Sequence, residues 1–301
     1  TQGVSSAASD VYKRQAKDAA SLKIREMVSV GDLKLIGEVI SVEGDFATIE
    51  VYEDTSGLRA GEEVISTGRP LSVRLGPGLL KNMFDGIERP LKKIEDNHGA
   101  FIPSGIGFEN LDDQKEWDVE IKVAVGDEIH VGDIYATIME TKTIEHRLMS
   151  SFDGRVKEVK ESGAYKLEDT IVRLETSQGE KELKLYQYWP VRNPRPVKKI
   201  RPLELLLNTG QRVLDVFFPV AKGGTVAIPG GFGTGKTMLQ HQFAQYADAD
   251  IIIYIGCGER GNEMTQVLEE FPELIDPNTG YGLMERTILI ANTSNMPVAA
   301  R

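Results

Sequence analysis

The stretch PGGFGTGKTMLQ, residues 229–240, decides how the second half of this chain is expected to fold. It satisfies the pattern G-x-x-x-x-G-K-[ST], with Gly230 and Gly235 at the glycine positions and Lys236 and Thr237 at its end. Glycines let a backbone turn bring its N–H groups close to phosphate oxygens, the lysine supplies a positive charge, and a threonine hydroxyl can ligate Mg²⁺. The stretch therefore predicts a phosphate-binding loop.

The sequence around this loop has an α/β pattern. GTVAIPGG at 224–231 predicts an apolar strand leading into the loop, and the apolar positions within 238–246 predict a helix after it. Further on, DIIIYIG at 250–256 predicts a buried parallel strand, NEMTQVLEEF at 262–271 a helix, and RTILIAN at 286–292 another strand. Strand, glycine loop, helix and strand is the context that a phosphate-binding loop requires.

Hydrolysis of a bound nucleotide needs more than the loop, because water must be positioned and charge must be stabilised at the γ-phosphate. The run GCGERGNE at 256–263 follows the second predicted strand. Ligands of open α/β sheets lie outside the carboxyl ends of the strands, so Glu259 and Arg260 are expected beside the phosphates. Glu259 would orient the water and Arg260 would approach the γ-phosphate; the alternative is a surface ion pair between the two.

The N-terminal part predicts a tail and a small barrel. Residues 1–15, TQGVSSAASDVYKRQ, are polar and aperiodic and predict a disordered or non-native tail. Between 27 and 73, short β-rich runs alternate with glycine turns, as in a small β-barrel. GPGLLKNMFDGIERPLKKI, at 76–94, then predicts a turn and a short helix that ends near Arg89, because Pro90 cannot continue it.

A second β-rich block covers about residues 117–185. It contains Val-Gly-Asp twice, at 125–127 and 131–133, and resembles biotinyl and lipoyl carrier domains, in which a lysine on a hairpin is modified. Lys142 would be that lysine, but METKT is not the usual carrier context. We therefore interpret the block as a carrier-like β-sandwich that serves as a structural insert.

Composition narrows the classes of function. A net charge of -11 argues against a protein whose main function is to bind nucleic acid, since such proteins usually carry a basic surface patch. Cys257 is the one cysteine of the sequence, so no disulfide can form within the chain, as is usual in a reducing cytosol. Apolar runs such as 251–256 are too short to span a bilayer, so membrane association is expected to be peripheral.

Several motifs together resemble a known family. They are GPGLLKNMFDGIERPL, WPVRNPRPVK, TGQRVLDVFFPVAKGG, PGGFGTGKT, GCGERGNEMTQVLEEFPEL and TILIANTSNMPVAAR. In this combination they are similar to the catalytic A subunit, or alpha chain, of V-type and A-type rotary ATPases. The resemblance covers about residues 16–301, departs mildly inside the loop at 231–234, and is replaced at 1–15 by a stretch that looks foreign.

The resemblance implies a multidomain β plus α/β fold. We expect a disordered or non-native tail, an incomplete N-terminal β-barrel with the following helix, a connector, a β-sandwich bulge insert, and the N-terminal part of a RecA-like P-loop nucleotide-binding domain. Their expected boundaries are 1–15, 16–91, 92–112, 113–188 and 189–301. Because the family continues past the position of Arg301, the resemblance also implies a fragment that is catalytically incompetent alone.

The resemblance assigns roles to the residues of the loop and of the strand end. ATP or ADP with Mg²⁺ would be held by the loop, with Lys236 on the β- and γ-phosphates and Thr237 on the metal ion. Glu259 becomes the water-activating carboxylate, with Arg260 beside the γ-phosphate, so that Glu259, Arg260 and Lys236 are the catalytic residues. The expected nucleotide-binding residues are Gly230, Gly231, Phe232, Gly233, Thr234, Gly235, Lys236 and Thr237.

The implied assembly is an alternating hexamer with the B subunit, which supplies an arginine in trans, together with central and peripheral stalk subunits. It would act on the cytoplasmic side, peripheral to a membrane sector that translocates H⁺ or Na⁺, in ATP hydrolysis or synthesis, without nucleic acid. Two alternatives stay open: a non-catalytic assembly subunit of the same machine, and a Rho-type hexameric RNA translocase. The intact Lys236 and Thr237 argue against the first, and the acidic balance and the insert argue against the second.

Overall fold

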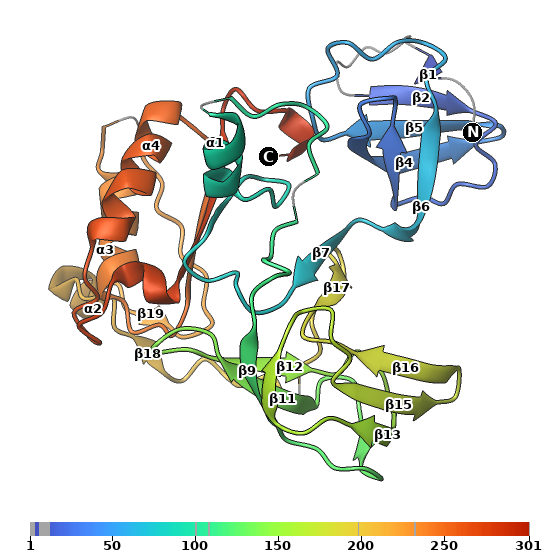
Figure 1. Ribbon diagram of the computed structural model, residues 1–301. Coiled ribbons are helices and arrows are strands. Elements are labelled where there is room, and N and C mark those ends of the chain that lie inside the picture. Colours follow the sequence, from blue (N-terminus) through green and yellow to red (C-terminus); the bar gives the residue numbers. More distant parts are fainter. Residues whose placement is uncertain are drawn as a thin grey trace.

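The computed structural model describes the backbone of residues 4–5 and all of residues 13–99, 101–107, 109–197, 199–231 and 233–300. Figure 1 shows three lobes, formed by the N-terminal strands, by the middle of the chain and by the C-terminal third. Among these described residues, no helix combines the length and apolar character needed to cross a membrane.

The N-terminal lobe is a six-stranded antiparallel sheet that curls around a small core (Figure 1). Side chains of its strands alternate between the core and the outside, as in β5, where Ala47, Ile49 and Val51 are buried. The strands, in the order β1-β2-β5-β4-β3-β6, are β1 Val4–Ser5, β2 Lys13–Lys17, β3 Glu26–Val30, β4 Leu35–Glu43, β5 Phe46–Val51 and β6 Val64–Pro70. The barrel predicted from the glycine-punctuated runs is confirmed.

The tail predicted for residues 1–15 is wrong at its C-terminal end. Lys13–Lys17 form strand β2, which pairs antiparallel with β5, and β1 pairs with β2 in turn. Only Ala16 of β2 is buried in the barrel core, so the strand lacks the apolar alternation by which a sequence pattern is recognised. Pairing with the edge of β5 holds it instead. Residues 1–3 and 6–12 of that predicted tail lie outside the described part of the chain.

The expected barrel unit, residues 16–91, is divided between three sheets. β7, Ser72–Leu75, pairs with β17, Gln187–Pro190, which brings together the two chain segments that flank the insert. β8, Met83–Phe84, lies parallel to a strand of the C-terminal lobe. After the barrel, β8 therefore adds a strand to the sheet of the C-terminal lobe, while β7, among the described residues, pairs only with β17.

The helix predicted to end near Arg89 was placed wrongly. α1 spans Leu91–His98 and has Pro90 as its N-cap residue. The Asp85 carboxylate accepts hydrogen bonds from the backbone N–H groups of Ile87 and Arg89, which closes a turn before the helix. Because proline has a fixed φ and no N–H, it suits the start of a helix, and here it begins one.

The middle lobe is a sandwich of two four-stranded sheets, as predicted. Side chains from both inner faces form one apolar core that includes Ile138, Leu174 and Leu185. The sheet orders are β10-β13-β15-β16 and β12-β11-β9-β14. The strands are β9 Trp117–Ile121, β10 Glu128–Ile129, β11 Ile134–Met139, β12 Glu145–Met149, β13 Gly154–Val159, β14 Gly163–Tyr165, β15 Val172–Thr176 and β16 Gly179–Leu183.

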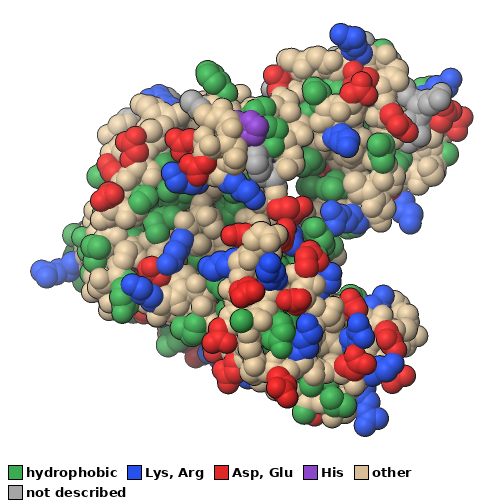
Figure 2. Space-filling model, in the orientation of Figure 1, with side chains coloured by type: hydrophobic (Ala, Val, Ile, Leu, Met, Phe, Trp, Pro, Cys, Tyr) green, Lys and Arg blue, Asp and Glu red, His purple; other side chains and the backbone are tan. Residues whose placement is uncertain are grey.

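The outer surface of the sandwich carries charges of both signs, which Figure 2 shows interspersed over this lobe. Arg173 forms ion pairs with Glu158 at 3.1 Å and Glu182 at 3.3 Å. Such exposed ion pairs are typical of a solvated β surface. Lys142, the candidate for carrier modification, packs against the C-terminal lobe: its Nζ lies 5.0 Å from the ring centre of Tyr281.

The C-terminal lobe is built around a parallel sheet in the order β20-β21-β8. The predicted strands and helices at 238–271 and 286–292 are formed. The strand expected at 250–256 is not fully buried, however, because Ile253 and Ile255 are 58% and 54% accessible. The elements are β18 Leu206–Leu207, α2 Arg212–Phe217, β19 Val220–Ala221, α3 Lys236–Tyr246, β20 Ile252–Glu259, α4 Gly261–Glu270, η1 Phe271–Glu273, η2 Leu283–Arg286, β21 Thr287–Thr293 and η3 Val298–Ala300.

The strand predicted at 224–231 is not formed. This segment has no strand partner among the described residues, and Val226 is half exposed. An apolar segment forms a β-strand only when a neighbouring backbone forms hydrogen bonds with its N–H and C=O groups. The free edge of β20 is not met by this segment, so the apolar run stays irregular in spite of its composition.

Candidate nucleotide site

The predicted phosphate loop forms a turn that leads directly into α3. Gly233 and Gly235 both adopt positive φ, +74° and +82°, and Gly235 is the N-cap residue of the helix. The Thr234 hydroxyl donates a hydrogen bond of 2.9 Å to the carbonyl of Gly231, which tightens the turn. Phe232, also predicted to contact nucleotide, lies outside the described residues.

Lys236 and Thr237 occupy the first turn of α3, where free backbone N–H groups and the helix dipole favour an anion. The Lys236 ammonium donates a hydrogen bond to the carbonyl of Gly230 across the mouth of the loop. Gly231, Gly233, Thr234 and Gly235 are exposed, so a phosphate can approach the loop from solvent. These groups fit a Mg²⁺-nucleotide: the ammonium suits phosphate oxygens, and the Thr237 hydroxyl is an oxygen donor of the kind Mg²⁺ takes.

An aromatic cluster holds α3 against the sheet. His241 lies on the buried side of the helix, with its ring centre 5.6 Å from that of Tyr254 on β20 and 5.3 Å from that of Phe271 in η1. Burial lowers the pKa of His241, against a smaller opposing effect of the Glu270 charge. The helix that begins with Lys236 is thus packed directly on the strand that ends with Glu259.

Glu259 and Arg260 lie at the carboxyl end of the second predicted strand. Glu259 is the last residue of β20, and Arg260 is the exposed N-cap residue of α4. Burial raises the pKa of the Glu259 carboxyl, a hydrogen bond and the charge of Glu263 raise it further, and the charge of Lys236 opposes them. The positive charge of Lys236 therefore acts on the Glu259 carboxyl.

Sequence reasoning missed two contacts of Glu259. Glu263 lies in the first turn of α4, four residues further on, and shares a hydrogen bond with the Glu259 side chain. The Ser294 N–H, just after β21, donates a 2.8 Å hydrogen bond to the Glu259 carbonyl. The helical i, i+4 rule did not signal the first contact, because Glu259 ends strand β20 and only Glu263 lies in α4. The Ser294 contact was not foreseeable either, because it depends on how β20 and β21 pair.

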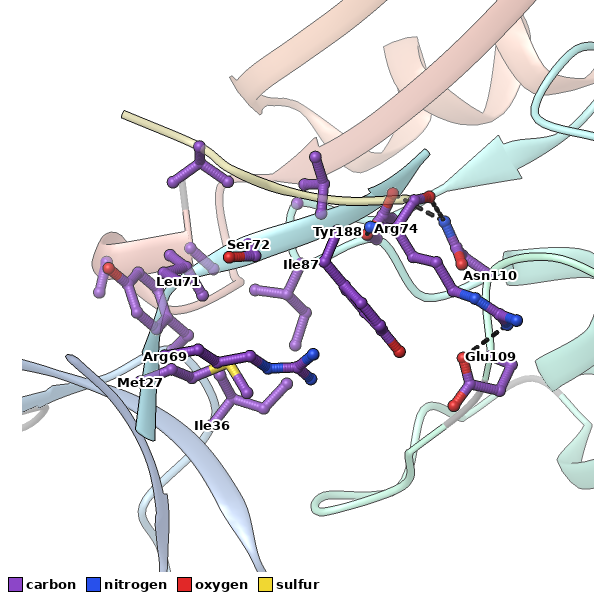
Figure 3. Close-up of a pocket in the computed structure, with 17 residues that line it drawn as sticks. Met27, Ile36, Arg69, Leu71, Ser72, Arg74, Ile87, Glu109, Asn110 and Tyr188 are labelled. Atoms are coloured by element: carbon purple, nitrogen blue, oxygen red, sulfur yellow. Dashed lines mark hydrogen bonds and ion pairs between the residues drawn. The ribbon is translucent and has the colours of Figure 1, made fainter. Parts of the chain in front are cut away.

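A separate cavity of about 310 Å³ lies between the barrel and the β7/β17 pair (Figure 3). It is lined by Met27 and Ile36 of the barrel, by Arg74 and Tyr188 of the strand pair, and by Glu88. Burial raises the pKa of Glu88 to about 7. The described residues of the loop at 230–237 do not line this cavity, so it is distinct from the candidate phosphate site.

Three family models match consecutive parts of the chain. The beta-barrel domain of the ATP synthase alpha/beta family matches residues 12–68, the ATP synthase alpha/beta subunit barrel-sandwich domain matches 108–192, and the nucleotide-binding domain of the same family matches 210–301. These descriptions agree with the three lobes, and they support the predicted fold class.

Proteins with high sequence identity to this chain are named as subunits of V-type and A-type ATP synthases. The V-type ATP synthase alpha chain 2 of Clostridium tetani is 62% identical over 289 residues, which are 95% of this chain and 49% of that protein. The A subunit of the A-type ATP synthase of Methanopyrus kandleri is 56% identical over 290 residues, again 95% and 49% of the two chains. The chain thus spans about half the length of the curated relatives it matches.

A solved structure supports the fold alone. The assembled ATPase EscN, in complex with its central stalk EscO from the type III secretion system of enteropathogenic E. coli, is similar with a TM-score of 0.55 at 18% identity. The match covers 100% of this chain and 51% of that one. At this identity the likeness says that the arrangement of domains is shared.

Proposed function

From the premise that this chain belongs to the ATP synthase alpha/beta family, we propose that it is part of the catalytic A subunit, or alpha chain, of a V/A-type rotary ATPase. Such a protein binds ATP and ADP with Mg²⁺ and hydrolyses or synthesises ATP while a membrane sector translocates H⁺ or Na⁺. The names of the relatives favour this function over an RNA translocase and over a non-catalytic assembly subunit.

The observation that carries the proposal is that the fold brings the loop at 230–237 and the side chain of Glu259 to the same pair of packed elements. The loop at 230–237 leads into α3, and Glu259 is the last residue of β20. The aromatic cluster around His241 packs this helix against this strand. In the proposed site, the N–H groups of the loop and the Lys236 ammonium bind the phosphates, and the Thr237 hydroxyl holds Mg²⁺. Bound there, Mg²⁺ would neutralise phosphate charge.

In the proposed reaction Glu259 accepts a hydrogen bond from the attacking water and orients it toward the γ-phosphate. A carboxyl whose pKa is raised is a stronger base once ionised, which suits this role. Arg260, next in sequence, is proposed to approach the γ-phosphate from the N-cap of α4. A further arginine from the B subunit would stabilise the transition state.

The proposed assembly is an alternating hexamer with the B subunit, joined to central and peripheral stalk subunits. It would lie on the cytoplasmic side of the membrane and contact the ion-translocating sector through the stalks. The names of the relatives, which are ATP synthase subunits, support this assembly, while its individual partners are inferred from the family.

The test compares Glu259→Gln with wild type in the full-length protein in complex with its B subunit. Glutamine keeps the size of the side chain and removes its basicity. We expect Mg-ATP affinity to be retained and turnover to fall by about 10²- to 10⁴-fold, the usual contribution of a general base. Lys236→Ala serves as the binding control and should weaken Mg-ATP affinity itself. Undiminished turnover in Glu259→Gln would exclude the proposed role of this carboxylate.

A further inference from the structure

The ladder between β20 and β21 contains an irregularity directly before Glu259. The two strands pair in register up to Cys257, opposite Asn292, and the next pair is Glu259 with Thr293. Gly258 is therefore an extra residue without a partner, which is a β-bulge. Its φ is +72°, a conformation that residues with a side chain rarely adopt.

This bulge changes the side of the sheet on which Glu259 lies. Successive side chains of a strand alternate between faces, so an uninterrupted β20 would put Glu259 on the same face as Ile253 and Ile255. That face is exposed: Ile253 and Ile255 are 58% and 54% accessible. The observed Glu259 side chain lies on the other face, since a Cβ built on Gly256 would be 3.2 Å from its Cγ.

The face that Glu259 shares with Gly256 is the one covered by the two helices of the site. The same built Cβ on Gly256 would lie 2.5 Å from Sδ of Met264, in α4, so the glycine leaves room for both side chains. Tyr254, also on this face, contacts His241 of α3. The Ser294 N–H holds the Glu259 carbonyl just past the bulge, at 2.8 Å.

We propose that Gly258 and Gly256 are positioning residues for Glu259: the bulge at Gly258 turns the carboxylate to the side of the phosphate loop, and Gly256 leaves space for it. The inference rests on the proposed function, because it concerns how that carboxylate reaches the nucleotide. Neither glycine touches the substrate; both act through Glu259. A misplacement of a catalytic group by about 1 Å can cost about 10²-fold in rate.

The experiment uses the full-length protein in complex with its B subunit and compares Gly258→Ala with Gly280→Ala. Gly280 has a nearly equal φ of +74°, lies in a loop after η1, and has open space where a Cβ would be added. Both variants therefore place alanine at a similar, unfavourable positive φ. We expect Gly258→Ala to lower kcat by about ten- to a hundredfold. Its Kd for Mg-ATP should stay within about twofold of wild type, and Gly280→Ala should keep both constants.

Gly258→Asn supplies the rescue, because asparagine enters the left-handed region more readily than alanine. It should recover most of the lost turnover. If Gly258→Ala does not assemble, Gly256→Ala tests the same idea by crowding Glu259, and we expect it to lower kcat with the Kd unchanged. Equal kcat in both glycine variants and wild type would overturn the inference. Loss of Mg-ATP binding in the glycine variants would do so as well.

The outcome of this experiment is separable from that of the proposed function. Wild type and Glu259→Gln are measured in the same assay. If wild type does not hydrolyse ATP, or Glu259→Gln hydrolyses it equally fast, the proposed function or the proposed role of Glu259 fails first. If Glu259→Gln is inactive while Gly258→Ala and Gly256→Ala match the Gly280→Ala control, the function stands and the positioning inference alone is wrong.

Discussion

The strands β11 of the insert and β20 of the nucleotide-binding region have similar apolar sequences and different surroundings. In β11, IYATIM, four consecutive residues from Tyr135 to Ile138 are buried. In β20, IIYIGCGE, every second side chain is exposed, and Ile253 is 58% accessible where Ile138 is 2% accessible. Composition therefore predicts the strand, but it does not predict which of its faces is covered.

The physical reason for this difference is the number of layers. Stacking of the two insert sheets buries one face of β11, and the irregularity between Ile134 and Ala136 brings the side chain of Tyr135 into the same core. A parallel sheet needs cover on both faces. Among the described residues, α3 and α4 cover one face of β20, and the face with Ile253 is exposed. Apolar side chains of α2, such as Val216 and Phe217, are also exposed.

We expect the largest change in the free energy of unfolding when one side chain in each region is truncated, which tests this contrast. Leu174→Ala, at a fully buried site of the insert, should lower the free energy of unfolding by about 2–5 kcal/mol. Ile253→Ala, on the open face of β20, should cost under about 1 kcal/mol, because little buried surface is lost. Urea unfolding of this 301-residue chain, followed by region-resolved hydrogen exchange, measures both. An equal cost for the two variants would show that the face of β20 is covered.

The next effect concerns Arg74, which joins the insert to the rest of the chain. Its buried guanidinium pairs with Glu109, Asp113 and Glu168 at 3.0, 2.6 and 3.2 Å, and Figure 3 shows it extended toward Glu109. It also lies 4.0 Å from the ring centre of Tyr186.

We expect Arg74→Met to lower the free energy of unfolding by about 1–3 kcal/mol, because hydrogen bonds to a charged group are lost at a buried position. Arg173→Met is the matched control, since Arg173 also pairs with two glutamates but is half exposed. It should cost under about 1 kcal/mol. Equal losses in urea unfolding would mean that burial of Arg74 contributes nothing to the junction.

The smallest expected effect separates the two regions by pH. His241 has a lowered folded-state pKa, so below its ordinary value of 6.5 the unfolded chain binds more protons than the folded one. The nucleotide-binding region should therefore lose stability as pH falls below about 6.5, by about 1.4 kcal/mol for each unit of pKa difference. Hydrogen exchange of peptides around α3 and η1 measures this loss. His241→Phe, the control, should abolish it.

The insert should respond only at lower pH. Burial alone would raise the pKa of Glu140, but hydrogen bonds from His146 and from the backbone N–H groups of Gly78 and Leu80 outweigh it, and the folded-state pKa is lowered from 4.5. The stabilisation is then complete above about pH 4.5 and is lost as pH falls further. Exchange at the hairpin of β11 and β12 that already increases near pH 6 would contradict this order.

Much of this molecule could be predicted from local sequence. The glycine loop, α3, β20, α4, β21 and the sandwich each carry their signal within a short window, in periodicity, glycine placement or turn residues. The strand β2 could not be predicted, because Ala16 is its one residue in the core. The expected strand at 224–231 did not form, because strand formation depends on a neighbour and not on composition.

The sequence by itself determined that a glycine-rich turn at 230–237 leads into a helix, and it placed Glu259 at the end of a strand. Backbone turns and helix starts are local, so residue types at fixed spacing specify them. Only the tertiary structure decided which way the Glu259 side chain points and which strands adjoin it. The bulge at Gly258 arises from pairing with β21, a strand about thirty residues further along the chain, and no local pattern encodes that register.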